Sequence, residues 1–438
     1  MKKEFYALSN LVNVKEKNYC KKILNNFPKR LGLNKLRISK LLKKIGNPHE
    51  SLPPVIHIAG TNGKGSTVAF IKAGLESRGD KVHVFTSPHL VDITERILIA
   101  GKKIDLKHFN VLLEKCVKAN GNNDLSFFEL ITAVAFLAFS REKAHWTILE
   151  VGLGGRLDST NVIKSPLLSI ITPISMDHQE FLGNNIKKIA FEKSGIIKEN
   201  SKVIISKQKN AALKVIKNEA NKVDCKTYIY GNDFKAKYCK NSFLFITKRK
   251  KIKLPIPLLN GIHQIENASV SIAALIELKC RKKNLVDALT KVSWQGRLQK
   301  IEKGKLIPKN SEPNGEVFLD GGHNKSAGIA LSKWVKNFEK IKFYIILGMM
   351  NNKDVEGFLK PIKPYIHKLI AIKIPQQKNS YDAKEIFEKT KSLDINSQVT
   401  ESLEKALQIV YNEKTCIPKI ILVTGSLYLV GSFLEKNK

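Results

Sequence analysis

The stretch HIAGTNGKGST, residues 57–67, decides how the first part of the chain folds. An apolar run at residues 55–59 leads into a glycine-rich turn, after which Lys64 and Ser66 stand where a helix is expected to begin. Glycines allow backbone N–H groups to point at phosphate oxygens, and a helix N-terminus adds partial positive charge. Lys64 is placed to reach the outer phosphates of a nucleotide and Ser66 to hold Mg²⁺. The stretch therefore predicts a nucleotide-binding strand–loop–helix unit.

The spacing within this loop differs from the common phosphate-binding pattern GxxxxGK[ST]. Only two residues separate Gly60 from Gly63, and Gly65 stands between Lys64 and Ser66. An ordinary glycine-rich turn is the alternative, but it does not account for a lysine and a serine that both follow a strand. We expect the whole loop to contact the nucleotide: Gly60, Thr61, Asn62, Gly63, Lys64, Gly65 and Ser66.

Outward from this unit, short apolar runs alternate with helical patterns, which is typical of an α/β fold. Most runs are continuously apolar, as expected of parallel strands covered on both faces. Residues 225–257 are richer in Tyr, Phe and Lys and predict a small antiparallel insertion, with a helix over residues 265–279 after it. The other strands predicted in this part lie at residues 82–85, 147–151, 168–172 and 203–206.

The alternation stops at residues 300–315, a polar segment rich in Gly, Pro and Asn that predicts a loop or linker. Beyond it, strands are predicted at residues 317–320, 343–348, 369–374 and 420–424, and helices at residues 326–338 and 402–411. The sequence thus predicts two α/β domains. Residues 1–298 would form a P-loop ATPase-like domain with a mostly parallel sheet, and residues 299–438 a smaller Rossmann-like domain.

The charge balance is strongly basic, with 75 Lys and Arg against 39 Asp and Glu, a formal net charge of +36. A basic P-loop protein that binds nucleic acid is one interpretation. The excess is spread along the whole chain, however, and no nucleic-acid-binding module accompanies it. We therefore interpret it as a lysine-rich surface that favours small anionic substrates, and we expect no nucleic-acid partner.

The six cysteines are scattered, and no pair has CxxC spacing, so neither a zinc ribbon nor a redox motif is predicted. A reducing compartment fits this usage. The first residues are too polar for a signal peptide, and the longest apolar run, residues 133–139, is too short to cross a bilayer. We expect a cytoplasmic, monomeric protein with no membrane partner.

The compressed loop GTNGKGS resembles the Mur ligase superfamily of amide-bond-forming enzymes. Further segments resemble its folylpolyglutamate synthase and dihydrofolate synthase branch, occur in the order found in that family and cover both domains. These segments are FTSPHL (85–90), ERI (95–97), SFFELITAVAF (126–136), LEVGLGGRLDSTN (149–161), SMDHQEFLG (175–183), IAFEKSGI (189–196), GRLQ (296–299), DGGHN (320–324) and TGSLYLVG (424–431).

The resemblance implies two Mg²⁺ ions. Ser66, Ser87 and Glu150 would hold the first, and Glu150 ends a predicted strand, where open parallel sheets bind their ligands. By residue type alone, Glu150 fits equally a strand-end carboxylate paired with a lysine, and Ser87 a turn residue before proline.

The second ion would be held by His178 and Lys193. In the superfamily the matching lysine is carbamylated by CO₂, which replaces an ammonium that would repel the metal by an anion. Asp177 would orient the His178 imidazole. The alternative for Lys193 is a solvated surface lysine. The implied catalytic residues are Lys64, His178 and Lys193.

The segment at residues 126–136 begins with Ser126-x-x-Glu129, a capping box that predicts a helix start. The resemblance implies that this start also lines a pterin pocket, with an aromatic ring stacked on the flat ligand. The expected substrate residues are Ser126, Phe127, Phe128, Glu129, Arg156 and Asp158. The residues implied for the rest of ATP are Asn267, Arg297, Asp320 and His323.

The implied reaction is ATP-dependent ligation through an acyl phosphate. L-Glutamate would be added to 7,8-dihydropteroate, giving dihydrofolate, and to tetrahydrofolate, giving polyglutamates. The alternatives are a folylpolyglutamate synthase alone or a muropeptide ligase of the same superfamily. The departures from the family pattern are mild: Gly322 replaces the more usual Ala of DGAHN, and Gln299 a frequent Glu.

Overall fold

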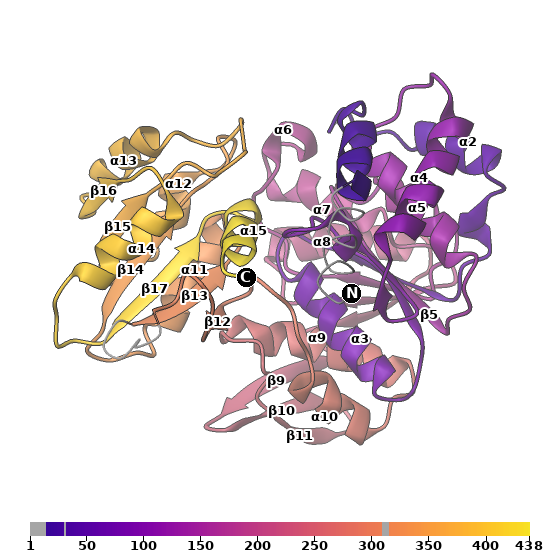
Figure 1. Ribbon diagram of the computed structural model, residues 1–438. Coiled ribbons are helices and arrows are strands. Elements are labelled where there is room, and N and C mark those ends of the chain that lie inside the picture. The colour runs from indigo at the N-terminus through magenta and orange to yellow at the C-terminus, as the bar shows by residue number, and fades with distance from the viewer. Residues whose placement is uncertain (1–14, 30–31, 309–314) are drawn as a thin grey trace, which may run out of the picture.

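The computed structural model describes residues 15–29, 32–308 and 315–438. It has two α/β domains, each built on its own sheet, and a small three-stranded sheet attached to the first domain (Figure 1). The two domains lie side by side, with the last helix of the chain, α15 (Leu427–Lys436), on the side of the second domain that faces the first.

The first domain contains an eight-stranded sheet in the order β4-β3-β2-β5-β1-β6-β7-β8. The six strands from β2 to β8 in this order are parallel, and β3 and β4 add an antiparallel edge. Its strands are β1 (Val55–Ala59), β2 (Val82–Phe85), β3 (Ile97–Ile99), β4 (Lys102–Lys103), β5 (Trp146–Glu150), β6 (Leu168–Ile171), β7 (Lys202–Ile205) and β8 (Lys226–Ile229). The apolar runs that predicted parallel strands are thus confirmed.

Helices cover both faces of this sheet, which explains why β1 is buried along its whole length. Side chains alternate between the two faces, so Ile56 and Ile58 enter one core while Val55 enters another. One face packs against α3 (Lys64–Glu76), α9 (His263–Glu277) and α10 (Lys282–Thr290). The other packs against α2 (Lys35–Lys44), α4 (Leu106–Asn120), α5 (Phe127–Phe139), α7 (Ile186–Ser194) and α8 (Asn210–Lys222).

The antiparallel insertion is present but begins later than expected. It consists of β9 (Phe234–Cys239), β10 (Ser242–Thr247) and β11 (Lys251–Pro255), and buried Phe243 and Phe245 join the core on the α9 face. Residues 226–229, which were assigned to the insertion, form β8 at the edge of the parallel sheet. Ile229 is buried there and pairs with Ile205 of β7, a long-range contact that local composition does not encode.

The second domain contains a six-stranded sheet in the order β12-β13-β17-β14-β15-β16. Its strands are β12 (Gln299–Ile301), β13 (Glu316–Asp320), β14 (Lys342–Leu347), β15 (Ile366–Ala371), β16 (Ser397–Val399) and β17 (Lys419–Thr424). One face packs against α11 (Lys325–Val335), α12 (Val355–Leu359) and α13 (Ala383–Lys391), the other against α14 (Leu403–Asn412) and α15. Residues 300–301, expected to be part of a loop, instead belong to the antiparallel edge strand β12, which pairs with β13.

Close packing joins the two domains at α15. A Cβ atom at Gly431 would lie 1.9 Å from the carbonyl oxygen of Leu90, so this helix touches the backbone of a first-domain loop. Glu95 holds that loop by accepting hydrogen bonds from the backbone N–H groups of Leu90, Val91 and Asp92. The contact places α15 beside residues 85–97, two of the segments on which the resemblance rests.

None of the helices in the described ranges is both long enough and apolar enough to cross a membrane.

We predict that Gly431→Ala weakens the docking of the two domains. The added methyl group meets backbone atoms that cannot rotate away, and overpacking of this kind costs about 1–3 kcal/mol. Calorimetric unfolding of the variant should begin at a lower temperature than that of the wild type. Ser432→Ala, at the next position of the same helix, is the control and should unfold like the wild type. Unchanged unfolding of Gly431→Ala would contradict the packing described here.

Candidate active site

The phosphate loop packs closely on the end of strand β6. Gly60 has φ +154°, and a Cβ atom there would lie 1.8 Å from Thr172 Oγ1, so the position admits only glycine. The Lys64 amine turns back into the loop, where it donates to the carbonyl oxygens of Gly60 at 3.2 Å and Thr61 at 3.4 Å. The loop thus encloses a positive charge, which is the arrangement expected of a cradle for anionic phosphates.

The start of α3 explains the other two glycines of the loop. Gly63 is the N-cap with φ +86°, and a Cβ atom there would lie 2.5 Å from Asn267 Oδ1. A Cβ atom at Gly65 would lie 2.8 Å from Trp294 Nε1. Asn267 is buried and donates to Gln264 Oε1 at 2.9 Å. The structure therefore places Asn267 directly beside the phosphate loop, and both were predicted to contact ATP.

Oxygen-bearing side chains gather next to this loop. Glu150, at the end of β5, is buried, lies 4.0 Å from the Lys64 amine through Oε1, and accepts the Ser87 N–H at 3.2 Å through Oε2. Burial raises the pKa of Glu150, and the positive charge of Lys64 opposes that rise. Ser66 Oγ is buried and has no hydrogen-bond partner within the described part of the chain. Glu150 thus connects the Lys64 amine with the Ser87 backbone, and Ser66 lies two residues after Lys64 at the start of α3.

This set of ligands fits Mg²⁺, a hard cation that prefers oxygen ligands and keeps several waters. A buried hydroxyl without a protein partner needs an explanation, and a bound metal ion supplies one for Ser66. No group of three His, Cys, Asp or Glu suited to a metal occurs in the described ranges.

Lys193 is not a solvated surface lysine. It lies in the last turn of α7 with 5% of its surface exposed, and its amine donates to the Gly60 carbonyl oxygen at 2.9 Å. Burial lowers the pKa of Lys193 to about 7; the Lys64 charge lowers it further, while Asp177 and Asp158 oppose the shift. A substantial fraction of this amine is therefore neutral near pH 7.

His178 carries a neutral imidazole beside the same loop. Burial lowers the pKa of His178 to about 3, and its Nδ1 atom is buried with no hydrogen-bond partner among the described residues. A neutral ring with a free nitrogen suits metal binding. The orienting role predicted for Asp177 is not seen, because Asp177 Oδ1 lies 4.0 Å from His178 Nε2, too far for a hydrogen bond.

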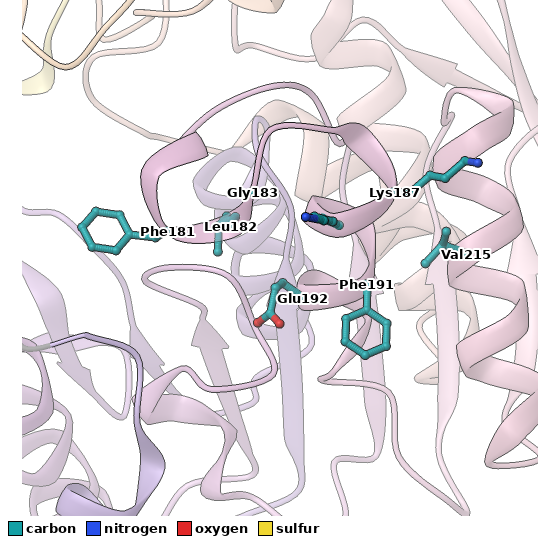
Figure 2. Close-up of a pocket in the computed structure, with 8 residues that line it drawn as sticks. Phe181, Leu182, Gly183, Lys187, Phe191, Glu192 and Val215 are labelled. Atoms are coloured by element: carbon teal, nitrogen blue, oxygen red, sulfur yellow. The ribbon is translucent and has the colours of Figure 1, made fainter.

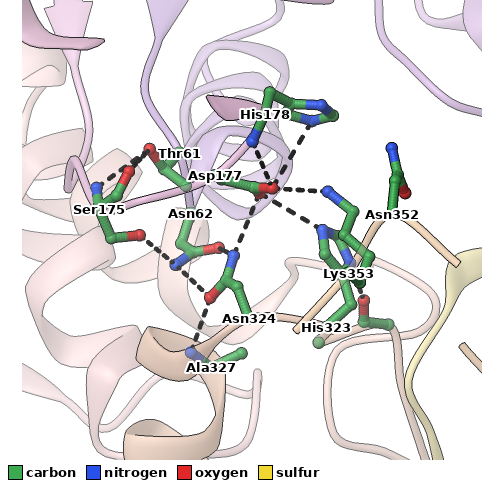
Figure 3. A network of polar contacts seen from close by, with 12 residues as sticks. Thr61, Asn62, Ser175, Asp177, His178, His323, Asn324, Ala327, Asn352 and Lys353 are labelled. Carbon is green, nitrogen blue, oxygen red and sulfur yellow. Dashed lines mark hydrogen bonds and ion pairs between the residues drawn. The ribbon is translucent and has the colours of Figure 1, made fainter. Parts of the chain in front are cut away.

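Instead, Asp177 contacts the second domain (Figure 3). It accepts hydrogen bonds from Lys353 Nζ at 2.5 Å and Asn324 Nδ2 at 3.3 Å, and it pairs with His323 Nε2 at 3.5 Å. Asn324 also exchanges two hydrogen bonds with the Asn62 side chain, at 3.2 and 3.1 Å. Sequence reasoning gave no role to Asn324 or Lys353. Both follow strands of the second sheet at its carboxyl edge, a signal that could have found them.

Asp320 and Arg297 meet where the chain passes between the domains. Asp320 Oδ2 accepts the Leu298 N–H at 3.0 Å, and Oδ1 accepts the Gly322 N–H at 2.8 Å. Arg297 donates to the Gly296 carbonyl oxygen at 3.0 Å. The two residues predicted to contact ATP thus also hold the linker and the DGGHN turn in place.

The capping box at the start of α5 is confirmed. Ser126 Oγ accepts the Glu129 N–H at 3.3 Å, and Glu129 Oε2 accepts the Ser126 N–H at 2.7 Å. Glu129 also pairs with Arg37 Nε at 3.0 Å. Its carboxylate is therefore occupied by protein groups, which favours a structural role over direct substrate contact.

The two aromatic residues of this helix start differ in their surroundings. Phe128 stacks on Phe85 at a centroid distance of 5.8 Å, and its ring lies where a Cβ atom of Gly152 would be. Phe127 lies 5.2 Å from the guanidinium of Arg96. The partly buried Phe128 ring thus meets the glycine-rich loop after β5, next to the helix start where the pterin pocket was predicted.

Arg156 and Asp158 shape that loop. The Arg156 guanidinium lies 3.9 Å from the Phe191 ring and pairs with Glu219 at 2.5 Å, so it points toward α8 rather than toward Phe128. Asp158 is buried and accepts the Leu153 N–H at 2.9 Å. These contacts stabilise residues 152–160, and they give Arg156 a structural function that the sequence did not reveal.

A hollow of about 520 Å³ adjoins this loop on the side of α6 (Gln179–Leu182), α7 and α8 (Figure 2). A Cβ atom at Gly154 would lie 3.0 Å from Leu182 and 3.7 Å from Glu192, so the loop touches the wall of the hollow. It is lined by Phe181, Leu182, Gly183, Lys187, Lys188, Phe191, Glu192 and Val215. None of the candidate metal ligands lines it.

Comparison with known proteins agrees with the geometry. Residues 58–275 match the family model of the Mur ligase middle domain, and residues 302–436 match that of the dihydrofolate synthetase C-terminal domain. The fold and site define an ATP-dependent, amide-bond-forming ligase of the Mur type.

The chain belongs to the dihydrofolate synthase/folylpolyglutamate synthase family. It is 32% identical over 430 residues to the dihydrofolate synthase/folylpolyglutamate synthase of Bacillus subtilis, covering 92% of this chain and 94% of the relative. It is 32% identical to the dihydrofolate synthetase of Saccharomyces cerevisiae, with 92% and 97% covered.

Solved structures give the same result. The complex of E. coli FolC with DHPP and ADP superposes with a TM-score of 0.86 at 25% identity, covering 95% of this chain and 97% of that one. Mycobacterium tuberculosis folylpolyglutamate synthase complexed with ADP and AMPPCP gives a TM-score of 0.84 at 25% identity, with 96% and 98% covered. These likenesses favour the ligase over a muropeptide-specific or nucleic-acid-binding protein.

We predict that Gly63→Ala weakens nucleotide binding, because the added Cβ atom has no space beside Asn267. Gly46→Ala is a matched control, because Gly46 has φ +89° against +86° at Gly63 but a Cβ atom added there would have no neighbour within 4 Å. Both variants should lose about 1 kcal/mol of stability, since a left-handed conformation disfavours a Cβ atom. Only Gly63→Ala should bind ADP more weakly, by about tenfold or more, in titration calorimetry. Equal ADP affinities of the two variants would contradict the role of Gly63.

Proposed function

We propose that this chain joins L-glutamate to 7,8-dihydropteroate and to tetrahydrofolate in an ATP-dependent reaction. The observation that carries the proposal is the convergence of Lys64, Glu150 and Lys193 on one glycine-rich loop. The relatives support it, since the Bacillus subtilis relative is named for both activities, and one solved relative of the family holds ADP and DHPP.

The reaction has two steps. An oxygen of the acceptor carboxylate attacks the γ-phosphorus of ATP, the bond from that phosphorus to the β–γ bridging oxygen breaks, and ADP leaves with the electron pair. The amine of glutamate then attacks the acyl carbon, inorganic phosphate leaves, and the amine loses a proton. Because the protein supplies no nucleophile, its contribution is positioning and charge neutralisation.

The residues of this chain divide that work. The Lys64 amine lies in the phosphate loop, where it would neutralise charge on the transferred phosphoryl group. Asn267, Arg297, Asp320 and His323 would complete the ATP site from both sides of the domain boundary that we place at residue 298. Residues 299–438 would close over the acyl phosphate and exclude water, which prevents hydrolysis.

Two Mg²⁺ ions fit this site. Ser66, Ser87 and Glu150 would hold one, and His178 with Lys193 the other; a bound Mg²⁺ neutralises phosphate charge and orients the reacting oxygens. Lys193 would serve as a carbamate, because an ammonium would repel the ion. Its burial supports this assignment, since carbamate formation needs the neutral amine and burial lowers the pKa of Lys193 to about 7.

The acceptor would bind between the start of α5 and the loop after β5. The rings of Phe127 and Phe128 offer stacking surfaces, and Ser126, Glu129 and Asp158 fix the backbone around them. Arg156 would act indirectly, by holding the loop against α8. We further propose that the enzyme acts as a monomer in the cytoplasm.

The proposal predicts ADP release only when acceptor, glutamate and Mg²⁺ are all present. The purified chain would be given ATP, Mg²⁺ and L-glutamate with either dihydropteroate or tetrahydrofolate, and ADP would be measured by a coupled assay. Activity with both acceptors is expected. Activity with tetrahydrofolate alone would restrict the enzyme to polyglutamylation, and no release with either acceptor would refute the function.

We predict that CO₂ activates CO₂-depleted enzyme with a midpoint near pH 7. The neutral amine of Lys193 reacts with CO₂, and its fraction increases as the pH rises through the lowered pKa of about 7 instead of through 10.5. At constant dissolved CO₂, the activation rate should therefore increase from pH 6 to 8 and level off above that. A rate that keeps rising up to pH 10 would contradict a buried, neutral Lys193.

Lys193→Ala provides the control for this prediction. The variant should be inactive and insensitive to CO₂, and short carboxylic acids should restore part of its activity by replacing the missing carbamate oxygens. Full activity of the variant without rescue would exclude the carbamate.

A further inference from the structure

Two loops of the second domain reach the metal side of the first domain. One follows β13 and carries His323 and Asn324; the other follows β14 and carries Lys353. Side chains from both loops contact Asp177 (Figure 3). Asp177 thus connects the domain proposed to close over the site with the loop that carries His178.

The pair formed by Asp177 and Lys353 is largely removed from water. The side chains of both residues are 10% exposed, and their charged atoms are 2.5 Å apart. A buried ion pair is strongly destabilised when one partner is removed, because the other charge remains uncompensated. Separation of the domains must therefore expose Asp177 to water or give it another partner.

The same carboxylate oxygen also fixes the backbone of the candidate metal ligand. Asp177 Oδ1 accepts both the Lys353 amine at 2.5 Å and the His178 N–H at 2.9 Å. His178 has φ +49°, a conformation that few residues other than glycine adopt without support. Lys353 and the backbone of His178 are therefore linked through one oxygen atom.

We propose that Asp177 is a positioning residue that couples closure of the second domain to the metal-binding position of His178. Docking brings Lys353, His323 and Asn324 onto Asp177, and Asp177 then holds the His178 backbone, which sets the position of the imidazole. This inference rests on the proposed function, because it takes His178 as a ligand of the second Mg²⁺. The second metal site is complete only when the second domain is docked.

Through Asn62, the phosphate loop also contacts the loop that follows β13 in the second domain. Its side chain exchanges two hydrogen bonds with Asn324, the residue that also donates to Asp177. Docking therefore sets the loop and the metal ligand together. Phosphoryl transfer would await the arrival of the domain that shields the acyl phosphate from water, which limits its wasteful hydrolysis.

The test compares Asp177→Asn, Lys353→Met and the double variant with Asn352→Ala. Asn352 is the matched control, because it also crosses between the domains, donating to Glu180 Oε1 at 3.0 Å, but does not contact Asp177. Mn²⁺ binding would be measured by electron paramagnetic resonance in the presence of AMPPNP, and domain closure by energy transfer between dyes on the two domains. Thermal unfolding would verify that each variant is folded.

We expect two Mn²⁺ ions in the wild type and in Asn352→Ala. In Asp177→Asn and Lys353→Met the weaker ion should bind about tenfold less tightly, and the closed population should fall, while the tighter ion is unaffected. The double variant should be no worse than the worse single variant, since both changes remove the same coupling. The KM for dihydropteroate should stay unchanged.

Wild-type affinity for both ions in the two single variants would overturn the inference, as would additive losses in the double variant or a single Mn²⁺ in the wild type. A loss of thermal stability without a change in Mn²⁺ affinity would show a merely structural pair and overturn it as well. Failure of the proposed function has a different signature, because the wild type would then release no ADP with either acceptor.

Discussion

The position of the Gly60 backbone is the constraint on which the rest of the site depends. Its carbonyl oxygen accepts both the Lys64 amine, from the loop itself, and the Lys193 amine, from α7. Thr172 leaves no space for a side chain at this residue. One peptide group therefore sets the distance between the phosphate cradle and the lysine proposed to become a carbamate. Two amines beside each other repel, and that repulsion disfavours the charged form of Lys193 in the same direction as burial does.

The carboxyl edges of two parallel sheets face each other across the site. β1, β5 and β6 deliver the phosphate loop, Glu150 and the chain leading to His178, and β13 and β14 deliver the loops with Asn324 and Lys353. An edge of this kind collects side chains from segments far apart in sequence, because parallel strands all end there. The polar contacts that Asp177 and Asn62 make across the boundary are partly buried, so they favour one docked arrangement. The close packing of Gly431 against the backbone of Leu90 supports the same arrangement from the other side.

Sequence reasoning succeeded where the information is local. The strands predicted for the first sheet lie within one residue of the observed bounds at each end, because continuous apolar runs between turn residues are characteristic of buried parallel strands. The capping box at Ser126 was predicted for the same reason. Reasoning failed for β8, whose pairing with β7 involves residues more than twenty positions away. It also did not predict the partners of Asp177 and Arg156, whose charged groups contact other elements.

The sequence by itself determined the α/β fold, the phosphate loop and the family, since these follow from short segments. The backbone conformation of each such segment depends mainly on neighbouring residues. The order and spacing of the glycines in the phosphate loop identify the superfamily, because each glycine meets a separate steric requirement. Gly60 lies against Thr172, Gly63 against Asn267 and Gly65 against Trp294. Only the tertiary structure decided which groups donate hydrogen bonds to the same oxygen atom and which charged side chains form buried ion pairs. The partners of Asp177 come from three parts of the chain, and burial shifts the pKa of Lys193. Both effects depend on the surroundings that folding creates, and no local pattern in the sequence contains them.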